Sequence, residues 1–181
     1  GASGKILKLI ENFLENRYQR VILNGQCSSL QKIKAGVPQG SILGPLLFLI
    51  YINDISNGLE SNVKLFADDT SIFLIIFDPS LSAIALNNDL EKIQQWAFQW
   101  KMSFNPDLTK QAQEVVFSKK RDKQNHPDLY FNELKVKRVQ SQKHLGLVLD
   151  EKLNFKVHLK NVTDKITKNI VVLLKFRPHV P

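Results

Sequence analysis

Apolar residues recur at helical spacing in three segments of the chain. The first segment covers residues 4–16. The second begins at Asp78-Pro79-Ser80, where a capping carboxylate precedes a proline, and its apolar face continues to Trp100. The third runs from about Asn154 to Phe176 and combines an apolar face with many lysines. This spacing predicts three amphipathic helices.

Other segments alternate in the manner of strands. Asn24-Gly25 lies between two strand-like runs and predicts a β-hairpin. The stretch VKLFADDTSIFLII predicts a second hairpin, with strands over 63–67 and 70–76, because it is rich in β-branched and aromatic residues. Smaller elements are expected as a strand at Glu114–Ser118, a hairpin at Leu129–Val136 and a strand at His144–Leu149.

A loop rich in glycine, Gly36-Val37-Pro38-Gln39-Gly40-Ser41, precedes an apolar helix expected around 42–56. Together the elements predict an α+β fold. We expect an antiparallel sheet that carries the 63–76 hairpin, helices packed on one face of it, and a basic, helical C-terminal portion.

The charge is distributed unevenly along the 181 residues. The formal net charge is +8, and residues 101–181 hold 17 Lys and Arg against 8 Asp and Glu, whereas residues 1–100 hold 8 against 9. The excess therefore lies in the second half, which indicates a polyanionic partner. A lysine-rich solvated face would produce the same charge.

Cysteine content and hydropathy exclude some classes of protein. Cys27 is the only cysteine, so the chain has no internal disulfide and no cysteine-built zinc site. The longest apolar run, Ile42–Ile52, contains Gly44 and Pro45 and is too short to span a bilayer. We expect an intracellular chain without a membrane partner, in either nucleus or cytoplasm.

Asp68 and Asp69 are adjacent carboxylates between two apolar, strand-like runs. Such a pair is self-repelling, and a divalent cation between the two groups relieves the repulsion. Two magnesium ions held in this way activate the attacking oxygen and stabilise the leaving oxygen in phosphoryl transfer. A solvated Asp-Asp turn is the alternative interpretation of the dipeptide.

The residues around this pair resemble a known family. FADD on a hairpin, preceded by GVPQGSILGPLLF (Gly36–Phe48), is similar to motifs C and B of reverse transcriptases from non-LTR (LINE) retrotransposons, close to the jockey-like elements. Phe104-Asn105-Pro106 through Lys110 resembles motif D, and His144–Leu147 resembles motif E. The resemblance implies a partial palm over residues 1–118, followed by the motif E hairpin and part of a thumb over 119–181.

The resemblance implies RNA-directed DNA polymerase (nucleotidyltransferase) chemistry, with deoxynucleoside triphosphates added to a primer 3′-hydroxyl on an RNA template. Asp68 and Asp69 would bind magnesium, with manganese as an alternative. Lys110 would act on the leaving pyrophosphate, although a surface lysine is an equal alternative. The residues that would contact nucleotide, template or primer terminus are Gly36, Pro38, Gln39, Gly40, Ser41, Phe66 and Ala67.

The C-terminal part would hold the RNA–DNA hybrid. His144, Leu145 and Gly146 would support the primer, although the same residues would serve as the core of any small sheet. Lys156, Lys160, Lys165 and Lys168 would contact phosphates and produce salt-dependent binding, and a plain amphipathic helix would have the same pattern.

The chain departs from the family pattern upstream of Gly36. The family has a further aspartate there, in motif A, and a fingers subdomain, whereas the acids among residues 1–35 are Glu11 and Glu15. We therefore expect the chain alone to be inactive and to need the missing N-terminal half of the polymerase. The alternatives are a non-catalytic nucleic-acid-binding remnant and a non-functional truncated copy of an element.

Overall fold

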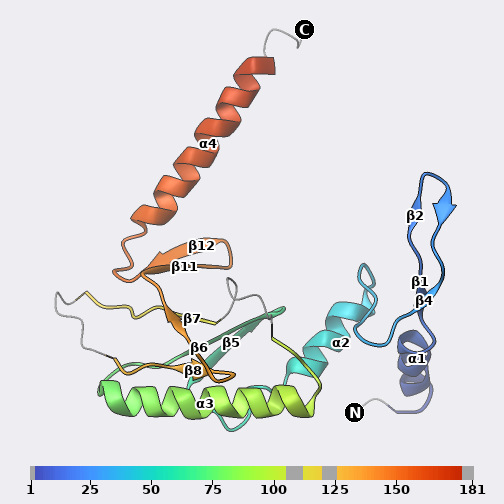
Figure 1. Ribbon diagram of the computed structural model, residues 1–181, viewed down its shortest axis with the longest axis horizontal. Coiled ribbons are helices and arrows are strands. Elements are labelled where there is room, and N and C mark those ends of the chain that lie inside the picture. The colour runs from blue at the N-terminus through green and yellow to red at the C-terminus, as the bar shows by residue number, and fades with distance from the viewer. Residues whose placement is uncertain (1–2, 105–111, 120–125, 177–181) are drawn as a thin grey trace. The chain divides into compact units, whose positions relative to one another are not determined.

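The computed structural model describes residues 3–104, 112–119 and 126–176 (Figure 1). The described residues divide into two compact units. One contains the residues up to Asn57 together with Lys64–Ser71, and the other contains Gly58–Val63 and the residues from Ile72 onward. The functional boundary expected between residues 118 and 119 stays a prediction.

Four helices and twelve short strands form in the described residues. The helices are α1 (Gly4–Leu14), α2 (Leu43–Ile52), α3 (Pro79–Gln99) and α4 (Lys156–Phe176). The strands are β1 (Tyr18–Gln19), β2 (Ile22–Leu23), β3 (Gln26–Cys27), β4 (Gln31–Lys32), β5 (Asn62–Phe66), β6 (Asp69–Phe73), β7 (Gln113–Glu114), β8 (Tyr130–Phe131), β9 (Leu134–Lys135), β10 (Lys137–Arg138), β11 (Ser141–His144) and β12 (Leu147–Asp150). The mixture confirms an α+β fold.

The strands pair two by two in the described part of the chain. The pairs are β1–β4, β2–β3, β5–β6, β8–β9, β11–β12 and β7–β10, of which the last is parallel. An antiparallel sheet that carries the 63–76 hairpin was expected, and the described strands instead form separate two-stranded sheets. Most of them are only two residues long, so each provides few ladder hydrogen bonds.

The first unit contains the N-terminal hairpin. Ile22 pairs with Cys27 and Leu23 with Gln26, around a turn in which Asn24 has φ +49° and Gly25 has φ +77°. Two positive φ values are what a two-residue type I′ turn requires. The Asn24-Gly25 hairpin is therefore confirmed.

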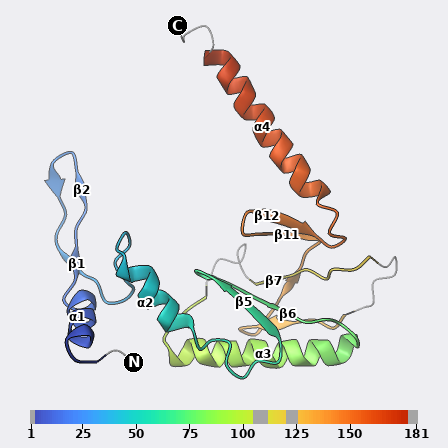
Figure 2. The same cartoon turned by 180° about the vertical axis from the view of Figure 1, so that it is seen from behind.

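The second unit is organised around α3. The helix begins as predicted, because the Asp78 side chain accepts a hydrogen bond from the Leu81 N–H at 2.8 Å and proline follows it. Figures 1 and 2 both show α3 alongside β8. Between them lies a buried apolar cluster, composed of Ala83, Leu86 and Leu90 from the helix and Leu129 and Val136 from the hairpin segment.

Two expectations in the second unit are wrong. Residues 144–149 do not form one strand. Instead β11 and β12 form a hairpin around Leu145-Gly146, whose φ values are +47° and +87°. The strand expected over 114–118 is reduced to β7, which ends at Glu114.

His126 lies in the polar segment 119–128 and is nevertheless only 3% exposed. The Arg138 Nη2 donates to its carbonyl oxygen at 2.9 Å, and Glu114 Oε1 lies 3.3 Å from its Nδ1. These partners bury the ring, although they are distant from it in sequence. Residues 120–125 of that segment lie outside the described residues.

Candidate active site

Asp68 and Asp69 lie at the closed end of the β5–β6 hairpin. β5 ends at Phe66 and β6 begins at Asp69, so Ala67 and Asp68 form a two-residue turn. Both aspartates are exposed, and neither side chain has a hydrogen-bond or ion-pair partner among the residues that the structure covers. The hairpin was predicted correctly, with Asp69 as the first residue of a strand rather than part of the turn.

The turn holds Ala67 at φ +50°, in the left-handed region that residues other than glycine rarely adopt. Such a residue costs about 1–3 kcal/mol, and strained positions of this kind concentrate at functional sites. The strain therefore falls directly beside the two carboxylates. A glycine here would relieve the strain, yet the chain has alanine.

The loop before α2 is built by local hydrogen bonds. The Ser41 hydroxyl donates to the Pro38 carbonyl oxygen at 2.7 Å and accepts from the Gly44 N–H at 3.0 Å. Gly36 and Gly40 have φ values of +80° and +77°, which glycine adopts without strain. Ser41 thus ties the loop to the first turn of the helix.

Gly44 is a functional candidate that sequence reasoning did not select, although it lies inside the GVPQGSILGPLLF motif. It is buried, and a Cβ at this position would lie 2.8 Å from both the Pro38 carbonyl oxygen and Ser41 Oγ. Only glycine permits this close approach. Arg17 adds a second support, since its Nη2 donates to the Gly36 carbonyl oxygen.

The glycine-rich loop and the Lys64–Ser71 end of the hairpin belong to the same compact unit. Gln39 and Gly40 are exposed, as are Phe66 and Ala67, whereas Pro38 and Ser41 are partly buried. Most of the side chains expected to contact nucleotide or primer terminus are therefore accessible. Lys110 lies outside the described residues.

The Asp68 and Asp69 carboxylates have the donor chemistry that a magnesium ion requires. Magnesium takes oxygen ligands from one or two carboxylates and completes its shell with water and substrate phosphates. The exposed carboxylates of Asp68 and Asp69 match this donor chemistry. Within the described ranges, no group of three or more His, Cys, Asp or Glu residues could hold a metal. The pair therefore fits as part of a site.

The residues expected to support the primer form the β11–β12 hairpin. His144 pairs with Leu147, and Leu145 and Gly146 make the exposed turn. The hairpin contacts α4, because His158 Nδ1 accepts a hydrogen bond from the Val148 N–H at 3.3 Å. These residues belong to the second unit, whereas Asp68 belongs to the first.

The four lysines of α4 are all exposed along a helix without buried residues. At 3.6 residues per turn, Lys156, Lys160, Lys165 and Lys168 fall on the sides of the helix away from the stripe of Leu159, Val162, Ile166, Ile170 and Leu173. The stripe is exposed too.

None of the described helices is long and apolar enough to cross a membrane.

Asp150 fixes the segment that leads into α4. It is buried, and its carboxylate accepts hydrogen bonds from the N–H groups of Lys152, Asn154 and Phe155 at 3.1, 3.2 and 2.7 Å. Burial alone would raise the pKa of Asp150, but these backbone donors stabilise the charged form and lower it below the ordinary value. Sequence reasoning had found no role for this residue.

The second missed carboxylate is Asp89. It has no exposed surface and accepts hydrogen bonds from the Glu60 N–H at 3.0 Å and the Ser61 N–H at 2.7 Å, directly before β5. Burial alone would raise the pKa of Asp89, but these donors, the Ser61 hydroxyl and the charge of Lys92 outweigh it and lower the pKa. The sequence did contain a signal for Asp89, because it is an acidic residue on the otherwise apolar face of the predicted helix.

Comparison with known proteins adds family information. Residues 3–149 match the family model described as Reverse transcriptase (RNA-dependent DNA polymerase). The chain is 31% identical over 162 residues to "RNA-directed DNA polymerase from mobile element jockey" of Drosophila melanogaster, an alignment that covers 85% of this chain and 17% of the relative. It is 32% identical over 169 residues to the protein of the same name from Drosophila funebris, covering 88% of this chain and 18% of the relative.

A third relative is "Probable RNA-directed DNA polymerase from transposon X-element" of Drosophila melanogaster. It is 28% identical over 167 residues, which cover 90% of this chain and 18% of the relative. The chain thus spans 17–18% of the length of these curated relatives. No solved structure gives a significant match.

Proposed function

The chain belongs to the reverse transcriptase (RNA-dependent DNA polymerase) family and is a jockey-like reverse transcriptase domain of a mobile element. From this premise we propose that Asp68 and Asp69 form its metal-binding element. The observation that carries the proposal is the placement of two adjacent, exposed carboxylates at a tight hairpin turn, Asp68 within it and Asp69 directly after it, with no partner for either side chain among the described residues. When bound, magnesium supplies charge stabilisation for nucleotidyl transfer.

The glycine-rich loop and the residues before the aspartate pair contact the substrates. Gly36, Pro38, Gln39, Gly40 and Ser41 form the wall of the nucleotide and template pocket, with a backbone that the Ser41 and Arg17 hydrogen bonds keep in place. The attacking hydroxyl belongs to the primer, so no protein nucleophile is needed. Phe66 and Ala67 lie next to the carboxylates in sequence and contact the primer terminus.

The C-terminal part of the chain contributes to binding of the RNA–DNA hybrid. We assign residues 1–118 to a partial palm and 119–181 to the motif E hairpin and a partial thumb. The exposed lysines of α4 contact phosphates, because a helix with cations on its solvent face binds a polyanion without reading its sequence. Lys110, in the motif D position, acts on the pyrophosphate.

Catalysis requires a further carboxylate from a part of the polymerase upstream of Gly36. Residues 3–35 offer Glu11 and Glu15, both on or beside α1, and the aspartate pair alone would position magnesium poorly. The active form is therefore the domain within, or complemented by, the N-terminal part of such a polymerase.

The test is primer extension on an RNA template with magnesium and deoxynucleotides. The chain is assayed alone and together with the upstream reverse transcriptase segment of the jockey polymerase. We expect extension only with both segments, and its loss in Asp68→Asn with Asp69→Asn. Extension that survives the double substitution would overturn the assignment of the carboxylates.

A second function, nucleic-acid binding without catalysis, is favoured by one observation. The described residues contain no third metal ligand beside the aspartate pair, whereas the basic surface of α4 is intact. Affinity for RNA–DNA hybrid that depends on salt but not on magnesium, with no extension under complementation, would support this function instead.

A further inference from the structure

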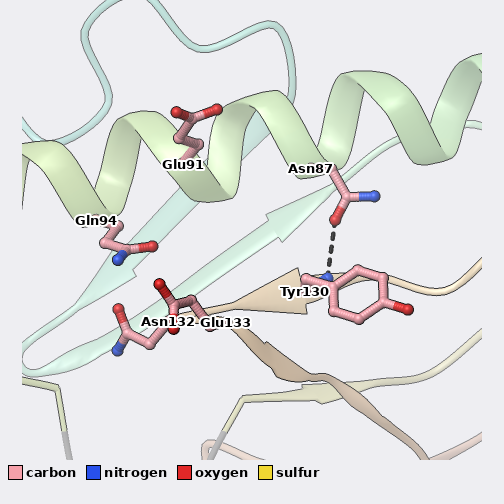
Figure 3. A pocket seen from close by; sticks show the side chains of 6 residues that line it. All are labelled: Asn87, Glu91, Gln94, Tyr130, Asn132 and Glu133. Carbon is pink, nitrogen blue, oxygen red and sulfur yellow. Dashed lines mark hydrogen bonds between the residues drawn. The ribbon is translucent and has the colours of Figure 1, made fainter.

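The two 21-residue helices of the second unit, α3 and α4, differ in how far their apolar faces are covered. The β8–β9 hairpin lies against α3, where Asn87 Oδ1 accepts a hydrogen bond from the Tyr130 N–H at 2.8 Å (Figure 3). Ile93 on the apolar face of α3 is accordingly 4% exposed. On α4, by contrast, Leu159 is 61% and Ile166 53% exposed, and no residue of this helix is buried. The apolar face of α4 therefore lacks the cover that α3 has.

Part of this exposed face follows the heptad pattern of a coiled coil, in which core residues alternate at spacings of three and four. We name these core positions the seam, and they are Leu159, Val162, Ile166, Asn169, Leu173 and Phe176. The five apolar members are 39–68% exposed. The 21 residues of α4 hold three heptads and extend about 31 Å at a rise of 1.5 Å per residue. A helix of similar length could thus cover the whole seam.

We propose that the seam is a dimer interface, at which α4 of a second copy of this chain packs in parallel and in register. Burial of the exposed seam side chains in both copies removes on the order of 1,200 Å² from water, which is the lower end of the range for specific interfaces. Ile170 and Val172 flank the seam and add apolar surface. The seam is therefore large enough for a dimer that dissociates on dilution.

Asn169, the single polar residue of the seam, favours a second copy in one alignment. In a parallel, in-register pair each core residue meets its own counterpart, so the two Asn169 side chains hydrogen-bond to each other. A shifted or antiparallel pair would instead place each amide against apolar side chains, where an unpaired polar group is costly. The same cost would apply to a partner whose helix is apolar throughout.

The lysines of α4 do not oppose this pairing. In a parallel dimer, a residue on one side of the seam faces the residue five positions later on the partner. Lys165 of one copy therefore faces Ile170 of the other, and no two lysines of α4 face each other. Lys160 and Lys168 fall on the side of the helix away from the seam, where they stay accessible to phosphates. The dimer is thus compatible with the binding of nucleic acid.

The test is sedimentation equilibrium of the full chain without nucleic acid, at concentrations from about 1 µM to 500 µM, a range in which weak dimers dissociate. We expect the mass to rise from 20.7 kDa toward twice that value. Ile166→Asp places a charge in the seam and should abolish the rise. Asn161→Asp introduces the same residue on the other side of α4 and should leave the rise unchanged. A monomer at every concentration, or a dimer that persists in Ile166→Asp, would overturn the proposal.

Cross-linking tests the alignment without introducing a charge. Cys27 is the only cysteine, so Cys27→Ser provides a background free of thiols. In that background, Leu173→Cys should form an intermolecular disulfide on mild oxidation, because each residue of the seam lies opposite its own copy. Asn161→Cys, on the other side of α4, is the control and should stay monomeric under the same conditions. No disulfide in Leu173→Cys, or equal cross-linking of both variants, would contradict the proposed dimer.

Discussion

The Asp89 carboxylate on α3 accepts a hydrogen bond from the Ser61 N–H at 2.7 Å and another from the Ser61 hydroxyl. Ser61 immediately precedes β5, the strand that leads to the Asp68–Asp69 turn. Lys92, one turn further along α3, donates to the Gly58 carbonyl oxygen at 2.8 Å. A buried charge and its neighbour therefore fix the chain where the hairpin begins.

The first prediction concerns the stability that this contact provides. The Asp89 carboxylate accepts hydrogen bonds from several N–H and O–H donors. The amide of Asp89→Asn has one acceptor oxygen in place of two, so it accepts fewer of these hydrogen bonds. Hydrogen bonds to a charged group contribute about 1.5–3 kcal/mol, so we expect the free energy of unfolding to fall by about 2 kcal/mol. Urea unfolding measures it. Glu91→Gln, an exposed position on the same helix, should change stability by less than about 0.5 kcal/mol.

The pH dependence of stability follows from the lowered pKa of Asp89. Because the folded-state pKa lies below the ordinary value of about 3.9, the charged form stabilises the fold above that value, and this stability is lost as pH falls through the folded pKa. Urea midpoints measured from about pH 6 down to pH 3 should decrease. A decrease of the same size in Asp89→Asn would assign the effect to other groups, with Asp150, whose pKa is also lowered, as the first alternative.

Gly44→Ala should destabilise the first unit. In an ordinary helix this substitution stabilises, by up to about 1 kcal/mol, but here the added Cβ would lie 2.8 Å from a backbone oxygen. Crowding of this kind costs about 1–3 kcal/mol, so the sign reverses. Thermal unfolding followed by circular dichroism tests it. Asn88→Ala, on the exposed side of α3, is the control and should be neutral or slightly stabilising.

The lysines of α4 should determine how hybrid binding depends on salt. Substitution of Lys156, Lys160, Lys165 and Lys168 by glutamine should lower affinity and reduce the slope of log K against log salt by about 1 for each lost phosphate contact. Fluorescence anisotropy with a labelled RNA–DNA hybrid measures the slope. Lys5→Gln with Lys8→Gln, two exposed lysines of α1, is the control and should leave the slope unchanged. An unchanged slope in the α4 variant would show that these lysines face solvent only.

Local chemistry made much of the fold predictable. The Asn24-Gly25 turn and the Asp78-Pro79 helix start have residue types that suit one conformation, and both form as expected. The strand pattern alone missed the β11–β12 turn, because Leu145 carries no local sign of its positive φ, whereas the resemblance to motif E placed a hairpin at His144–Leu147, and it forms there. The burial of His126 depends on Glu114 and Arg138, whose proximity only the folded chain provides.

Some features of the candidate site were likewise predictable from local sequence, whereas others depend on the folded chain. The position of Asp68 and Asp69 at the closed end of a hairpin follows from the flanking strands, so the sequence was sufficient for it. The contact of Asp89 with Ser61 joins residues 28 apart, and no local pattern could predict it. The role of Gly44 depends on how closely Pro38 folds back, which is likewise a property of the folded loop.

The central claim is that Asp68 and Asp69 bind a divalent metal. The most direct measurement is paramagnetic broadening of amide signals when Mn²⁺ is added to the ¹⁵N-labelled chain. The account predicts that broadening begins at residues 67–70, disappears in Asp68→Asn with Asp69→Asn, and persists in Glu11→Gln with Glu15→Gln. Broadening that begins elsewhere, or that is unchanged in the aspartate variant, would contradict the account.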